Sequence, residues 1–424
     1  MHLVLVSVVF GITLFMIVVR PWRISEAWSA GGGAAALVLT GAISPTSAVI
    51  SVIAEWNLFL FFFGLMLTAA VADMARFFDW AAALAARAAG GSGRRLLLTV
   101  LFLGALITTF LSNDAAAIML TPVVYGVVTR LRLRVVPYLF AIAFMANAAS
   151  MTLPISNPIN VLTGDKLGAS LGVYADHLLA ASIASITITA ACFMAIFWRA
   201  VDHRFDFDWR TATSGAAADR GFFLPVVLGL AALAAAYIAG SALLWPLGVV
   251  ATIGGIGLMG FAAIRHRVSR DVVRAHVSPT LFVYLASLFV LVRAAQEVGI
   301  TGALVAGATG HAGSAASAAI SGLVGSAVLS NLANNLPSQL LFVSGALSGG
   351  VSAGLRVPFL FGALAGADLG PNLTPVGALS TMLWLLIVRR RGIEVSSWDF
   401  LRLGVVIAPA TLIVAGILIA VSFR

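Results

Sequence analysis

The chain has 424 residues, of which 61% are hydrophobic and only 10% are charged. Soluble globular domains carry roughly 25% charged residues, so this composition excludes a soluble protein and indicates an integral membrane protein in a lipid bilayer. The formal net charge of +9 comes from arginines in short segments between apolar runs. That distribution fits membrane topology and not a nucleic-acid partner.

Apolar runs near the roughly 20 residues that cross a bilayer as a helix recur from end to end. Clear examples are residues 3–19, 58–71, 179–198, 222–244 and 403–421. Basic residues follow the first run and do not precede it, so we interpret that run as a retained span and not as a signal peptide.

The arginines predict the path of the chain, because short cytoplasmic loops carry an excess of Lys and Arg. Residues 96–129 are flanked by arginines at both ends, so we expect both ends on the cytoplasmic side and a re-entrant hairpin between them. Its tip is the triplet Ser112-Asn113-Asp114. Applied to the whole chain, the rule predicts about ten transmembrane helices, two re-entrant hairpins and both termini outside.

The same polar features recur in the second half of the chain. The first tip includes Leu-Ser-Asn at positions 111–113, and a second Leu-Ser-Asn at positions 329–331 is taken as the second hairpin tip. Prolines interrupt the apolar segment that follows each tip, and the interval between equivalent prolines almost equals the interval between the tips. These are Pro154 and Pro158 in residues 137–163, and Pro371 and Pro375 in residues 358–388. Either feature alone could be chance, but the matched order and spacing favour two repeats of inverted topology.

This interpretation divides an all-α membrane protein into four parts. Residues 1–24 form a first span and loop, 25–200 a first repeat with a cytoplasm-opening hairpin, and 201–220 a cytoplasmic linker. Residues 221–424 form a second repeat with an outward-opening hairpin at about 313–352.

Four polar motifs lie at the hairpins and helix breaks. They are residues 112–122 (SNDAAAIMLTP), 147–150 leading into 154–158 (PISNP), 334–337 (NNLP) and, most discriminating, 368–377 (DLGPNLTPVG) followed by Trp384. These motifs resemble those of the ArsB arsenite efflux permeases of the ion transporter superfamily. The resemblance covers nearly the whole chain. It implies export of arsenite and antimonite across the bacterial inner membrane in exchange for protons, sometimes with an ArsA-type ATPase on the cytoplasmic side. Some family members have an acidic residue at the position of Asn147, so no proton-binding role is assigned there.

Arsenite is mainly an uncharged trihydroxide at neutral pH, so its site must offer hydrogen-bond donors and acceptors. The candidates are the polar residues at the hairpin tips and helix breaks: Ser112, Asn113, Asn157, Asn331, Asn334, Asn372 and Thr374. Cys192 is the only cysteine, so a trithiolate site for arsenic is excluded and Cys192 is expected to pack. We expect no cofactor and no resident metal.

Coupling to protons requires a titratable group within the membrane, and Asp114 and Asp368 are the candidates. Asp114 has an alternative role, because it stands at the start of a half-helix where a carboxylate can cap free N–H groups. The alternative function is a sodium-coupled carrier of the same superfamily, either a sodium/proton antiporter or a dicarboxylate transporter, since backbone and Asn oxygens at two hairpin tips can also hold sodium.

The remaining polar residues are expected to be structural. Arg293 and Glu297, one helical turn apart, should form an ion pair on one helix face. The histidines His177, His203, His266, His276 and His311 are expected to be solvated, mostly in loops. The only lysine, Lys166, is not followed by Ser or Thr, so a phosphate-binding loop is excluded and we expect a transporter and not an enzyme.

Overall fold

The computed structural model describes residues 2–20, 24–205, 219–310 and 312–424. These residues form helices, with one isolated bridge between Ser92 and Arg204. Within the described ranges, nine helical segments are long and apolar enough to cross a membrane. The all-α membrane fold is therefore confirmed. Arg23, Arg210, His311 and most of the expected linker lie outside the described residues.

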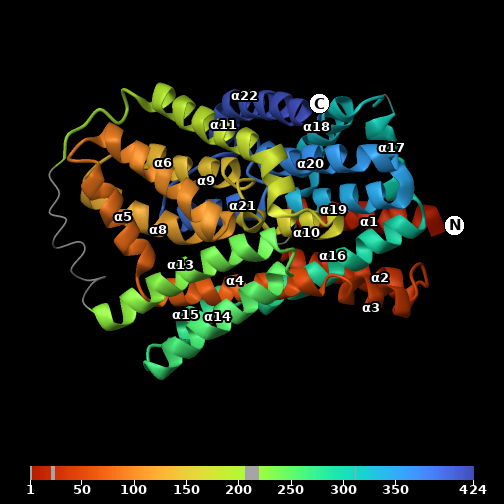
Figure 1. Ribbon diagram of the computed structural model, residues 1–424, viewed down its shortest axis with the longest axis horizontal. Coiled ribbons are helices and arrows are strands. Elements are labelled where there is room, and N and C mark those ends of the chain that lie inside the picture. Colours follow the sequence, from red (N-terminus) through yellow and green to blue (C-terminus); the bar gives the residue numbers. More distant parts are fainter. Residues whose placement is uncertain (1, 21–23, 206–218, 311) are drawn as a thin grey trace.

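The helices of the first half run from α1 to α11 (Figure 1). In chain order they are α1 (His2–Val19), α2 (Glu26–Leu39), α3 (Pro45–Ile53), α4 (Trp56–Met74), α5 (Phe77–Ala88), α6 (Gly93–Phe110), α7 (Asn113–Ala115), α8 (Thr121–Arg130), α9 (Val135–Ala148), α10 (Pro158–Leu167) and α11 (Leu171–Phe197). A π-helical turn, Ala116–Leu120, joins α7 to α8.

The helices of the second half run from α13 to α22 and include, as in the first half, a hairpin followed by a discontinuous helix. They are α13 (Arg220–Ala242), α14 (Leu247–Ile264), α15 (Arg270–His276), α16 (Pro279–Glu297), α17 (Ile300–Thr309), α18 (Ala315–Ala333), α19 (Asn335–Gly345), α20 (Ala353–Leu369), α21 (Leu379–Arg390) and α22 (Ser397–Ser422). Corresponding helices begin at nearly constant intervals along the chain. The interval from the start of α6 to the start of α18 almost equals the interval from the start of α10 to the start of α21.

The first hairpin turns at Ser112, between α6 and α7. The Ser112 backbone is extended, and its hydroxyl accepts a hydrogen bond from the Ala115 N–H at 3.1 Å. A serine in this conformation ends one helix and caps the next, because its oxygen satisfies a backbone donor that the new helix leaves free.

The second hairpin turns at Asn334, so the prediction of a tip at residues 329–331 is wrong. Ser330 and Asn331 lie in the last turn of α18, where both side chains donate back to the Ala327 carbonyl at 3.0 and 2.8 Å. These bonds are compatible with a continuing helix. Asn334 has a positive φ of 76°, and its side-chain oxygen accepts from the Leu336 N–H at 3.3 Å. The helix therefore ends later than the sequence pattern suggests.

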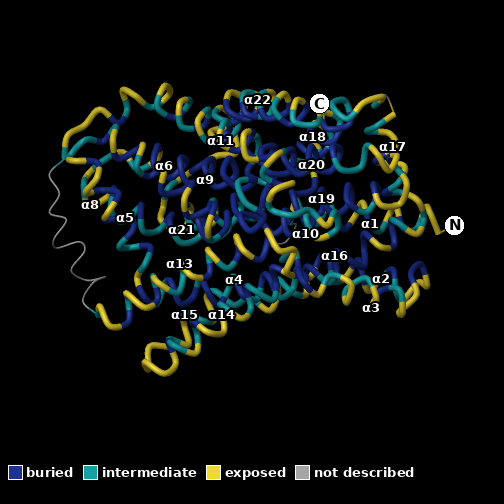
Figure 2. Tube along the Cα trace, in the orientation of Figure 1, coloured by how far each residue is buried: buried dark blue, intermediate teal, exposed yellow. Residues whose placement is uncertain are grey.

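Two discontinuous helices follow the hairpins. Between α9 and α10 the chain forms a 3-10 turn, Pro154–Ser156, and Pro158 is the first residue of α10. Between α20 and α21 a 3-10 turn, Gly370–Asn372, contains Pro371. Proline suits the start of a helix because its missing N–H would be unpaired there. The halves α9, α10, α20 and α21 lie among the other helices, and most residues of α9, α10 and α20 are buried (Figures 1 and 2).

The second hairpin packs closely on the discontinuous helix that follows it. At Gly362 in α20, an added Cβ would lie 1.9 Å from the Ala319 carbonyl oxygen of α18. Only glycine allows the two backbones to approach so closely. Close small-residue packing thus fixes the position of the α20–α21 break relative to the hairpin.

Candidate functional site

Amide and hydroxyl side chains join the two helix breaks in the interior. The Asn147 amide of α9 donates to Asn372 Oδ1 at 3.0 Å and to Thr381 Oγ1 at 3.2 Å. The Asn113 amide at the first hairpin tip is 3.4 Å from Ser380 Oγ. All five residues are buried. The structure therefore brings the predicted Asn113 and Asn372 together with three residues that the sequence-based selection omitted.

A buried carboxylate lies at the second meeting point of these elements. Asp368, in the last turn of α20, is 1% exposed, and its Oδ1 accepts from the Asn157 amide at 2.6 Å. Asn157 also caps α10, accepting from the Ile159 N–H at 3.3 Å. The Ser150 side chain lies within reach of the same carboxylate. Asp368 Oδ2 is buried without a partner among the described residues. An unpaired buried oxygen is costly, which marks this position for a proton, an ion or water.

Four short helices begin in this region, namely α7, α10, α19 and α21. The N-terminus of each helix carries free N–H groups and a partial positive charge. Ser112, Asn157 and Asn334 cap three of these N-termini. The region is therefore rich in donors that can bind the oxygens of a polar solute.

Asp114 faces a cavity and does not cap a helix. The cap is supplied by Ser112, and the Asn113 side-chain oxygen accepts from the Asp114 N–H at 2.9 Å. Among the described residues, the Asp114 carboxylate accepts no hydrogen bond. It lines a cavity of about 390 Å³ together with Tyr284 and His276. The capping alternative therefore applies to the neighbours of Asp114 and not to its carboxylate.

The opposite wall of the Asp114 cavity comes from elements outside the hairpins. Arg20 and Glu26, at the end of α1 and the start of α2, line it and form an ion pair. His276, at the end of α15, is 6% exposed at its side chain, and its Nε2 lies 3.0 Å from Met119 Sδ. The prediction that His276 is solvated is therefore wrong. The arginines that precede His276 on α15 indicate a solvated segment, so the sequence does not indicate that this histidine is buried.

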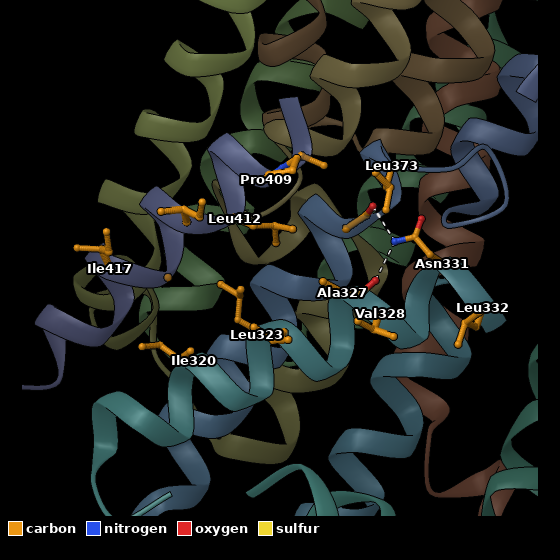
Figure 3. Close-up of a pocket in the computed structure, with 15 residues that line it drawn as sticks. Ile320, Leu323, Ala327, Val328, Asn331, Leu332, Leu373, Pro409, Leu412 and Ile417 are labelled. Carbon is orange, nitrogen blue, oxygen red and sulfur yellow. Dashed lines mark hydrogen bonds between the residues drawn. The ribbon is translucent and has the colours of Figure 1, made fainter. Parts of the chain in front are cut away.

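Asn331 and Thr374 hold two elements together. The Asn331 amide donates to the Ala327 carbonyl at 2.8 Å and to the Gly370 carbonyl at 2.9 Å, while its oxygen accepts from Thr374 Oγ1 at 2.7 Å. Asn331 lies at the edge of an apolar pocket of about 490 Å³ between α18 and α22 (Figure 3). Because the amide and the oxygen of Asn331 already form hydrogen bonds within the protein, Asn331 has little capacity to bind a polar ligand in this pocket.

Asn334 lies where the two halves of the site meet. Its amide is 3.4 Å from the Val376 carbonyl, just before α21. It also borders a small space shared with Glu26 and Tyr284, which line the Asp114 cavity as well. Outside the site, the predicted ion pair between Arg293 and Glu297 is confirmed at 3.0 Å.

Two discontinuous helices whose breaks meet in the interior, beside polar hairpin tips, define the fold of a membrane transporter. The chain belongs to the ArsB family, described as arsenical pump membrane protein, whose model matches residues 5–421. The family resemblance inferred from the motifs is confirmed.

Individual relatives agree with this assignment. The chain is 26% identical to the arsenical pump membrane protein of Escherichia coli K12, over 99% of this chain and 100% of that protein. It is also 26% identical to the protein of the same name from Yersinia enterocolitica, over 97% of each. The crystal structure of the Alcanivorax borkumensis YdaH transporter is similar in fold, with a TM-score of 0.57 and 15% identity over 89% of this chain and 87% of that one.

Proposed function

We propose that this protein exports trivalent arsenite, and antimonite, from the cytoplasm in exchange for protons. Membership of the arsenical pump family supports the substrate class. The observation that carries the coupling is Asp368, a buried carboxylate with one unpartnered oxygen where the two discontinuous helices meet. Intramembrane carboxyl groups of this kind form proton relays in transporters.

The substrate is the neutral trihydroxide. Asn113, Asn147 and Asn372 supply amide donors and carbonyl acceptors to arsenic-bound hydroxyls, and the nearby helix N-termini add further donors. Cys192, the single cysteine, lies in α11 and packs against apolar side chains of the first half. Recognition therefore depends on hydroxyl groups and not on sulfur ligands.

Arsenite enters from the cytoplasm through the Asp114 cavity. Arg20 lines this cavity, and Arg270 and Arg274 precede its His276 on α15. The excess of arginine at this end supports a cytoplasmic position in the bacterial inner membrane, with both termini outside. An ArsA-type ATPase is a further expected partner at the same face.

Arsenite tolerance of a sensitive bacterium tests the proposal. We expect the wild-type chain to raise the arsenite concentration that stops growth, and Asn372→Leu to abolish the gain because it removes the bond to Asn147 and the polar group of the site. Immunoblots of membranes should show equal amounts of both proteins. Wild-type protein that is present in the membrane yet gives no tolerance would contradict the proposal.

A further inference from the structure

We propose that a second cavity, near the start of α4, is the route by which external protons reach Asp368. This inference rests on the proposed proton antiport. The cavity has a volume of about 120 Å³, room for several water molecules. Its outer part is lined by Asp165 in the last turn of α10, Gly168 in the α10–α11 connection and Trp245 in the α13–α14 connection. The buried Asn57, at the start of α4, lines it as well. Its inner wall includes Pro154 and Asn160, which belong to the break between α9 and α10 and to the first turn of α10.

This cavity lies toward the end of the molecule opposite to the basic loops. Asp219, before α13, pairs with Arg267, after α14, so these two ends of the helix pair are adjacent. The connection that contains Trp245 lies at the other end of both helices. Along α4, Asn57 lines the small cavity, whereas Met66 and Ala69, more than two turns later, line the Asp114 cavity. The two cavities therefore approach the helix breaks from different ends.

The inner end of the cavity reaches the neighbourhood of Asp368 through two side chains. Asn160 is fully buried, and its amide donates to the Ser150 carbonyl at 2.6 Å. The Ser150 side chain in turn lies beside Asp368. The Tyr174 hydroxyl donates to the Met151 carbonyl at 3.1 Å, lies within hydrogen-bond reach of Asn160 and interacts electrostatically with Asp368. One short polar path thus connects the cavity wall with the carboxylate.

Two oxygens along this path have no partner among the described residues. They are Asn160 Oδ1 and Asp368 Oδ2, on either side of Ser150. Buried polar atoms without a protein partner are the positions that ordered water occupies, provided that the space is polar enough. Water in the cavity and at these two oxygens completes a chain along which a proton can move.

The charges near the outer part of the cavity favour cations. Glu55 pairs with Lys166 at 2.6 Å, and the exposed Asp165 adds one negative charge. Around Asp368 itself, the titratable group that faces it among the described residues is Tyr174, and no basic side chain pairs with it. At Asp368, therefore, no basic side chain of the described residues competes with the proton.

Gly164 allows the cavity to be filled without a clash. It lines the cavity, and an added Cβ there meets no atom within 4 Å. Gly172, at the start of α11, is exposed and does not line the cavity, so it is the matched control. The variants are Gly164→Leu and Gly172→Leu.

Two transport measurements in everted vesicles separate the proton route from folding. The first is arsenite uptake driven by an imposed gradient, acidic inside, and the second is arsenite–arsenite exchange at equal pH. We expect Gly164→Leu to slow driven uptake by about fivefold or more while exchange stays within about twofold, and Gly172→Leu to change neither beyond about twofold. Driven uptake that persists in Gly164→Leu, or an equal loss of both activities, would overturn the inference. A wild-type protein that exchanges arsenite but ignores the gradient would instead contradict proton antiport itself.

A second variant tests the same cavity without a bulky leucine, which could disturb the packing of the helices around it. In a Cys192→Ala background, Gly164→Cys should react with a membrane-impermeant, positively charged methanethiosulfonate added to the outside of intact cells. The reaction should then stop gradient-driven efflux. A cysteine at this position that does not react from outside, or whose modification leaves efflux unchanged, would show that the cavity is not the entry route.

Discussion

Asp368 and Asp114 differ in what surrounds their carboxyl groups. The Asp368 carboxylate is enclosed and bonded to Asn157, whereas the Asp114 carboxylate faces a cavity of about 390 Å³ and accepts no hydrogen bond among the described residues. A proton carrier must be shielded from the substrate path in one state, which the surroundings of Asp368 provide. We therefore place proton binding at Asp368 and contact with the entering solute at Asp114.

Replacing Asp368 by Asn removes the titratable group with little change in shape. The amide oxygen can still accept the bond from Asn157. We expect Asp368→Asn to lose gradient-driven arsenite uptake in everted vesicles by about tenfold or more while arsenite exchange persists. Asp79→Asn is the control, because Asp79 forms an interfacial ion pair with Arg76 at 2.9 Å, away from the site. A wild-type response to the pH gradient in Asp368→Asn would rule out Asp368 as the carrier.

The sequence identifies the conspicuous site residues but not their partners. Asp114, Asp368, Asn113 and Asn372 stand out because charges and amides are expensive within a membrane. Ser380, which contacts Asn113 from a helix 267 positions away in sequence, does not stand out because hydroxyl residues are common in membrane helices. Only the packing of the two helix breaks reveals such pairs.

Among the elements, the location of the helix breaks shows the limit of pattern matching. The repeated Leu-Ser-Asn led to a second tip at Asn331, but its side chain bonds back to the preceding turn and α18 continues to Ala333. The positive φ of 76° at Asn334, combined with an extended ψ of 156°, sets the end of the helix. Backbone conformation at one residue is not visible in a shared tripeptide.

The close contact between α18 and α20 can be tested at one glycine. A Cβ at position 362 would lie 1.9 Å from the Ala319 carbonyl oxygen, so Gly362→Ala must push the helices apart. We expect the free energy of unfolding to fall by about 1–3 kcal/mol. This loss should lower the Tm of the purified protein in detergent, which is the quantity measured. In the same helix, Gly354 has no atom within 4 Å of an added Cβ, so Gly354→Ala should stay within about 1 kcal/mol of wild type. Equal Tm values for both variants would contradict the tight contact.

At the scale of the whole molecule, composition was sufficient for the class, whereas the path of the chain inferred from the arginines stays a prediction. The boundaries of the repeats are a separate matter. The helix α1 starts at His2 and α13 at Arg220, and the interval between them is close to that of the later helix pairs. We therefore propose that α1 belongs to the first repeat, so that this repeat starts before residue 25. The sequence of a single apolar span does not show that it belongs to a repeat. Only comparison with the corresponding helix of the other half, here α13, reveals it.

Uphill arsenite transport in proteoliposomes tests proton-coupled export most directly. Purified protein is reconstituted, a pH gradient that is acidic on one side is imposed, and arsenite accumulation is measured with and without sodium. We predict accumulation on the acidic side above the external concentration, equal with and without sodium, and lost when an ionophore dissipates the gradient. Accumulation that requires sodium, or no accumulation from protein that still exchanges arsenite, would contradict proton antiport.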